Sequence, residues 1–184
     1  MLYNMNILSK TFLTIFSILL LAALNIGASY ILPYPYSKIN IIFIALLIIM
    51  MWSDSGTVIW ISFFSHFFIE LFSTTPYGII LFSSTIAWLF CFWLYKNFFT
   101  NRSWYSATAL MFFVLICYHL FYAIILLVTQ IFGLTGDISW SSLFVTAGWE
   151  ILFSVILMSI IYFILSIFIK KLSATTIEHG LFKV

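Results

Sequence analysis

The chain has 184 residues, of which 65% are hydrophobic and 7% are charged, and its formal net charge is +2. A soluble domain usually carries about 25% charged residues, and a chain of this length cannot hide so much apolar surface in its own core. We therefore expect lipid to solvate much of the chain. The scattered basic residues argue against a nucleic-acid partner.

The first apolar segment, residues 11–32, is longer than the apolar stretch of about 7–15 residues in a signal peptide, so we expect an uncleaved membrane helix. Five more apolar segments follow, separated by Pro, Gly, Asn, Asp and charged residues. The predicted fold is an all-α, polytopic integral membrane protein with about six transmembrane helices in a single transmembrane domain, residues 1–184. The expected helices cover residues 11–32, 39–52, 57–72, 79–95, 104–132 and 141–169.

The second and third segments are short. At about 1.5 Å per residue they reach about 21–24 Å, less than the hydrocarbon thickness of about 30 Å. We expect them to form a compact helical hairpin that the longer helices partly shield from lipid. A β-barrel is a poor alternative, because its strands are shorter and alternate in polarity.

The positions of Lys and Arg indicate the orientation. With six spans, one side of the membrane holds nearly all of them, while the other side holds Lys38 alone. The positive-inside rule then places both termini in the cytoplasm and supports an even number of spans. The residues on the basic side are Lys10, Lys96, Arg102, Lys170, Lys171 and Lys183.

The third segment carries a polar stripe. Ser62, His66, Glu70 and Ser73 follow one another at helical spacing, with Ser65 near the edge of the stripe. Intramembrane ionisable residues usually face a bundle interior or a water-filled cavity, and His66 and Glu70 are close enough to hydrogen-bond. The stripe fits a proton relay or polar ligand site, or else a buried polar pair that fixes helix packing. It supplies two possible metal ligands and no adequate further set, so no metal site is expected.

The last two segments carry further polar groups. Glu150 shares a face with Thr146 and Ser154, and it is either an interfacial structural residue or a buried group facing Glu70. In the fifth segment we expect His119 to be satisfied by a neighbour. Tyr118 and Tyr122 are expected to serve packing rather than ligand binding.

The loop after the fourth segment contains Lys96 and Arg102. We expect these cytoplasmic residues to signal topology, although Arg102 could also contact lipid phosphate or a partner. Asn101 or Ser103 could cap the fifth helix, and Asp54 is expected to form a cap or turn.

Motifs of common enzymes are absent from the sequence, including Gly-rich phosphate loops, the Gly-x-Ser-x-Gly elbow, His-Glu-x-x-His and Cys-x-x-Cys. Cys91 and Cys117 lie in apolar runs and are expected to pack as small hydrophobic residues. We therefore predict no enzyme activity, no catalytic residues and no cofactor.

The middle third of the chain resembles the rod shape-determining protein MreD family. Members tend to have a Gly-rich helix with an acidic residue, a short turn with Pro and Gly, and then the fourth helix. Here the pattern runs from Gly56 through Glu70 to the turn Thr75, Pro76, Tyr77 and Gly78. Glu70 stands where the family often has Asp, the helix lacks internal glycines, and His66 is an addition. The six-helix layout is also similar to the S components of energy-coupling-factor transporters.

The two resemblances imply functions of different classes. An MreD-like protein would be a non-catalytic scaffold of the bacterial cell-elongation complex in the inner membrane, with an MreC-type protein and the peptidoglycan-synthesis machinery as partners. An S-component-like protein would instead bind a small nutrient from outside for a vitamin or nutrient transporter. The resemblance suggests an outer pocket lined by Glu70, Glu150, Trp149 and Tyr77. Small pairs at Ala22-Ala23 and Gly27-Ala28 are candidates for docking on an energising subunit.

Overall fold

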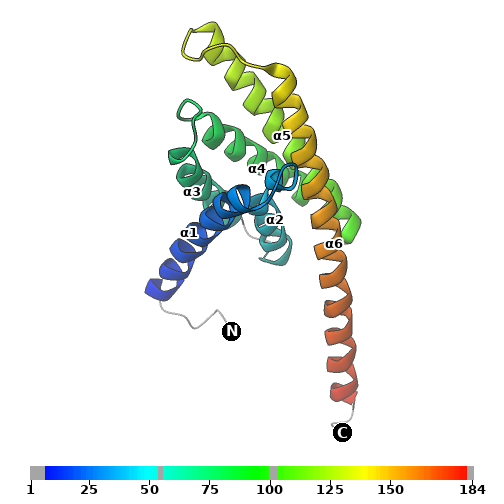
Figure 1. Cartoon of the computed structure of the whole chain (residues 1–184). Coiled ribbons are helices and arrows are strands. Elements are labelled where there is room, and N and C mark those ends of the chain that lie inside the picture. Colours follow the sequence, from blue (N-terminus) through cyan, green and yellow to red (C-terminus); the bar gives the residue numbers. More distant parts are fainter. Residues whose placement is uncertain (1–6, 54–55, 100–102, 182–184) are drawn as a thin grey trace.

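The computed structural model describes residues 7–53, 56–99 and 103–181, and the side chains within 12–53, 56–99 and 103–167. The described chain is all-helical, as predicted (Figure 1). Its elements are α1 (Ile7–Ile31), the 3-10 turn η2 (Tyr36–Lys38), α2 (Ile41–Ser53), α3 (Thr57–Leu71), α4 (Ile79–Asn97), α5 (Trp104–Ile131) and α6 (Trp140–Leu181).

Four helices of the described chain are long and apolar enough to cross a membrane. They contain the candidate spans Phe12–Ile31, Ile79–Asn97, Trp104–Ile131 and Trp140–Ile167. The other two, α2 and α3, have only 13 and 15 residues and fall below the length of a full span. The chain is thus compatible with a membrane protein, and the count of six spans stays a prediction.

Helix α6 is longer than predicted. The apolar segment was expected to give way to a polar tail after residue 169, but the helix continues to Leu181. The end of the apolar run marks the end of a membrane segment, but a change from apolar to polar residues does not break a helix. Residues 170–179 contain no Pro or Gly, so nothing in the local sequence terminates it. The last part of α6 extends well beyond the other helices (Figure 1).

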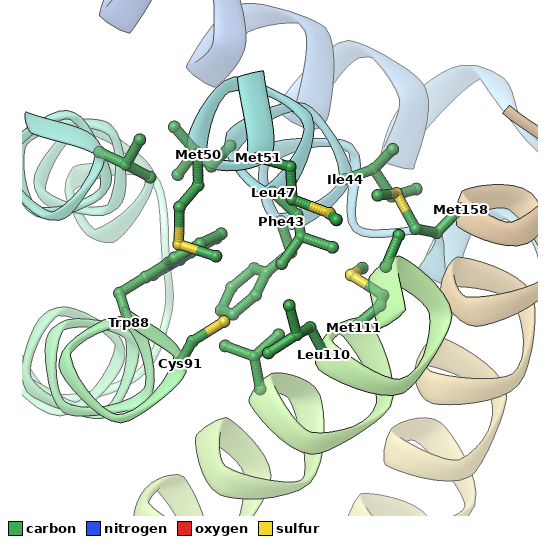
Figure 2. Close-up of a cluster of buried hydrophobic side chains, with 14 of the residues drawn as sticks. Phe43, Ile44, Leu47, Met50, Met51, Trp88, Cys91, Leu110, Met111 and Met158 are labelled. Atoms are coloured by element: carbon green, nitrogen blue, oxygen red, sulfur yellow. The ribbon is translucent and has the colours of Figure 1, made fainter. Parts of the chain in front are cut away.

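Helix α2 forms the centre of the bundle. It packs against α1, α3, α5 and α6, and seven of its 13 residues are buried. Phe43 lies at its core, with ring centroids 5.5 Å from Trp88 of α4 and 5.3 Å from Tyr118 of α5. Figure 2 shows Phe43 among Met50, Trp88, Cys91 and Leu110. Both cysteines are free thiols, and Cys91 is buried in this core.

The two short helices are shielded unequally. Helix α2 is enclosed as expected, whereas α3 exposes Trp60 and Phe64, which are 67% and 45% accessible. The polar residues of α3 lie on its opposite side, where Ser62, His66 and Glu70 are buried. Because helices in lipid gain little from hiding apolar groups, the aromatic face can remain outside while the polar face turns inward.

The connections α1–α2, which contains η2, α3–α4 and α5–α6 contribute to one end of the bundle. Lys38, Thr74 and Asp137, one from each connection, line the same cavity. Alternate connections lie at the same end wherever a chain runs back and forth through a bundle. This end is called the loop end below. The prediction that it faces away from the cytoplasm rests on the basic residues alone.

Candidate functional site

Glu70 caps the beginning of α4. Its Oε1 atom accepts hydrogen bonds from the backbone N–H groups of Gly78, at 2.7 Å, and Ile80, at 3.0 Å. The first N–H groups of a helix have no partner within the helix and carry partial positive charge, so a carboxylate satisfies them well. The Glu70 side chain is only 3% exposed. Within the described chain its Oε2 atom has no hydrogen-bond partner.

The turn between α3 and α4 is ordered by the side chain of Ser73. Its Oγ lies 2.8 Å from Thr75 Oγ1 and accepts from the Thr75 backbone N–H at 3.1 Å. Gly78 closes the turn with φ of +101°, a conformation that favours glycine. Tyr77 is 60% exposed and packs edge-on against Phe67. The predicted turn of Thr75, Pro76, Tyr77 and Gly78 is therefore physically joined to Glu70.

His66 and Glu70 do not form the pair that their spacing permits. His66 Nδ1 lies 2.9 Å from the carbonyl oxygen of Ser62 and 3.2 Å from its Oγ. The carbonyl can only accept, so Nδ1 carries a proton and donates to it. The polar stripe thus divides into a Ser62–His66 contact and a separate Glu70 cap. His66 turns back one helical turn, while Glu70 reaches forward to unsatisfied N–H groups.

Glu150 lies at the centre of a second polar cluster at the loop end. Its Oε1 accepts from Asn40 Nδ2 at 2.8 Å, and its Oε2 lies 3.4 Å from His119 Nε2. The side chains of Glu150 and His119 are each 15% exposed. The cluster therefore joins α6, α5 and the start of α2. Glu150 and Glu70 do not hydrogen-bond each other in the described chain. Glu70 binds the backbone at the start of α4, and Glu150 binds the side chain of Asn40 before α2.

Asn40 caps the start of α2, and it is held by neighbouring helices. Its Oδ1 accepts from the N–H of Phe43 at 3.1 Å, and its own N–H donates to Ser154 Oγ of α6 at 2.9 Å. The next N–H, of Ile41, donates to Asn25 Oδ1 of α1 at 3.0 Å. These bonds fix the position of the short helix between α1 and α6.

A cavity of about 750 Å³ opens beside Glu150 at the loop end. A smaller cavity of about 160 Å³ adjoins it and shares Lys38, Ile80, Tyr118 and Glu150. The larger one is of the size that binds small molecules. Its lining combines charged, hydroxyl, aromatic and aliphatic side chains: Lys38, Ser73, Thr74, Thr75, Ile80, Tyr118, His119, Tyr122, Leu126, Asp137, Ile138, Ser139, Ser142, Leu143, Thr146, Ala147 and Glu150.

The pocket suggested from sequence shares one of its four residues with the larger cavity. Glu150 lines the larger cavity, but Glu70, Trp149 and Tyr77 do not. Trp149 stacks on Phe153 along α6, with ring centroids 5.5 Å apart. The Glu70 carboxylate binds the backbone N–H of Gly78 at the start of α4. Hydrophobicity and spacing place these residues toward one end of the bundle, but do not determine which side of each helix faces inward.

Some cavity residues were missed or assigned to packing alone. Tyr118 packs on Phe43 as expected, yet it also lines both cavities. Asn40 lines the smaller cavity, and Lys38, which the sequence marks only as a topology signal, lines both. An asparagine beside an apolar segment, as at Asn25 and Asn40, is the signal that could have found them.

The predicted cytoplasmic contacts lie away from the cavity. Lys96 Nζ sits 5.6 Å from the centre of the Phe92 ring and 6.0 Å from that of Tyr95. Arg102 lies outside the described residues, as do Asn101 and Asp54. Ser103 is the N-cap of α5, with its Oγ 3.3 Å from the N–H of Ser106. Among the described side chains, no three His, Cys, Asp or Glu residues gather as metal ligands.

Comparison of the chain with protein-family models, curated proteins and solved structures found no match. The proposals below rest on the residues and contacts described above.

Proposed function

We propose that the chain is an MreD-like, non-catalytic scaffold of the bacterial cell-elongation complex, set in the cytoplasmic membrane with both termini in the cytoplasm. The observation that carries this proposal is the unit formed by Glu70, the turn and α4. The residues that resemble the MreD pattern are joined by hydrogen bonds of 2.7 and 3.0 Å to the backbone at Gly78 and Ile80. An acidic residue followed by a turn with Pro and Gly can therefore act as one motif, because the carboxylate binds the backbone N–H groups that the turn presents.

The shape of α6 suits a scaffold. Its apolar run ends at Ile169, and the helix continues to Leu181. At about 1.5 Å per residue this continuation is about 18 Å long. In the proposed orientation it projects into the cytoplasm, and it begins near Lys170 and Lys171. A continuous helix gives a partner a more rigid surface than a flexible tail would.

Co-purification tests this function. The full chain, carrying a tag, is expressed with the MreC-type protein of the same organism and, separately, with an energising transmembrane subunit of a nutrient transporter. We expect capture of the MreC-type protein in mild detergent, and no capture by an unrelated tagged polytopic protein. Capture of the energising subunit without the MreC-type protein would overturn the scaffold proposal.

A second candidate is an S-component-like binding subunit of a nutrient transporter. The observation that favours it is the cavity of about 750 Å³, which lies at the loop end beside Glu150. In the proposed orientation that end faces outward, where such a subunit would meet its ligand. Capture of the energising subunit in the same experiment would support this candidate.

A further inference from the structure

The hydrogen bonds around Asn40 fix which end of its amide group faces Glu150. Asn40 Oδ1 accepts from the N–H of Phe43, so the other end of its amide must be the NH₂ group. That group lies 2.8 Å from Glu150 Oε1, which therefore accepts. A neutral amide donor satisfies one oxygen, while the other has His119 at 3.4 Å, beyond the usual length of a strong charge-assisted bond. In the described chain, Glu150 thus brings to the cavity a carboxyl group that only Asn40 holds by a short hydrogen bond.

Lys38 brings the opposite charge to the same walls. Lys38 and Glu150 line both the larger and the smaller cavity, and Lys38 enters from η2 while Glu150 enters from α6. No ion pair within 4.0 Å joins them in the described chain. Glu150 instead contacts Asn40 and His119. The cavity therefore carries a cation and an anion at separate positions.

The same lining includes aromatic and aliphatic side chains. Tyr118 and Tyr122 of α5 contribute rings, and Leu126 and Leu143 add apolar surface. Ring faces attract a nearby ammonium group as well as apolar groups. The lining therefore combines two acidic residues, Glu150 and Asp137, one basic residue, Lys38, and apolar and aromatic side chains.

We propose that this cavity binds a small zwitterion of the amino-acid class with an apolar or aromatic side chain. The ligand's ammonium group contacts Glu150, its carboxylate contacts Lys38, and its side chain lies against Tyr118 and Tyr122. This inference adds a ligand class to the second candidate function and does not depend on the scaffold proposal, which is tested by capture of an MreC-type protein.

The test compares three probes that share a phenyl ring. L-Phenylalanine carries both charges, 2-phenylethylamine lacks the carboxylate, and 3-phenylpropionate lacks the ammonium group. A ligand that binds only the native state raises the temperature of unfolding, so each probe is titrated at millimolar concentrations against the purified full chain. We expect L-phenylalanine to bind on the order of tenfold or more tightly than either analogue, the range set by one hydrogen bond to a charged group.

Two variants assign the charges. Glu150→Gln can still accept from Asn40 and should remove the preference for L-phenylalanine over 3-phenylpropionate. Lys38→Gln should remove the preference over 2-phenylethylamine. Lys96→Gln, which makes the same charge change away from the cavity, should keep both preferences.

Equal stabilisation by the three probes would overturn the proposal, as would the absence of any stabilisation by L-phenylalanine. So would a Glu150→Gln variant that folds and keeps the full preference for the ammonium group.

Discussion

Two glutamates lie near the starts of two helices at the loop end, and they use their carboxylates differently. Glu70 is 3% exposed and binds the first N–H groups of α4 directly. Glu150 is 15% exposed, reaches the start of α2 only through Asn40, and borders a cavity of about 750 Å³. The difference lies in access to the cavities, because Glu150 lines both of them and Glu70 lines neither.

The largest effect is expected when Glu70 is lost. Glu70→Ala leaves the N–H groups of Gly78 and Ile80 without their acceptor in a buried site. We expect the free energy of unfolding to fall by about 3 kcal/mol, since each buried unsatisfied group costs about 1–3 kcal/mol. Unfolding in mixed micelles, followed by tryptophan fluorescence, measures the change. Glu70→Gln, which keeps one carbonyl acceptor, should lose less, and a loss below about 0.5 kcal/mol in Glu70→Ala would contradict the capping role.

The turn beside Glu70 should be the next most sensitive position. Gly78 has φ of +101°, and a Cβ there would lie 3.3 Å from the Phe82 ring. Gly78→Ala should therefore lower the free energy of unfolding by about 1–2 kcal/mol. Gly148→Ala in α6 is the matched control, because its Cβ would meet nothing within 4 Å. It should be neutral or slightly stabilising, and equal losses in the two variants would speak against strain at Gly78.

The cap of α2 should be weaker than that of α4. Asn40→Ala removes the acceptor of the Phe43 N–H and the donor to Glu150, but the cavity allows water to replace part of both. We expect a loss of about 1 kcal/mol, typical of an N-cap. Unfolding in mixed micelles, followed by tryptophan fluorescence, measures this loss for Asn40→Ala. A loss larger than that of Glu70→Ala would reverse the comparison between the two helix starts.

The smallest effect on stability is expected at Glu150. Glu150→Gln retains an oxygen for Asn40 and loses a charge that water partly solvates, so the free energy of unfolding should change by less than about 1 kcal/mol. Its response to L-phenylalanine should nevertheless change as proposed above. Measuring both quantities in one preparation separates the roles of the two glutamates. A loss as large as that of Glu70→Ala would make Glu150 a structural residue.

The sequence predicted part of the site and missed the rest for a definable reason. Helical spacing placed Ser62, His66 and Glu70 on one buried face of α3, as the structure shows. It could not tell that His66 binds its own backbone while Glu70 binds the next helix, because several partners lie within reach of each side chain.

The sequence by itself determined the all-helical class, the short lengths of α2 and α3, and the buried polar face of α3. These features follow from hydrophobicity, helical period and turn residues, which are local properties. Only the tertiary structure decided that α2 is the centre of the bundle, and that Asn40, His119 and Glu150 meet beside a cavity. His119 and Glu150 come from α5 and α6, and Asn40 immediately precedes α2. Their meeting depends on how each helix is rotated and crossed, which no local pattern specifies.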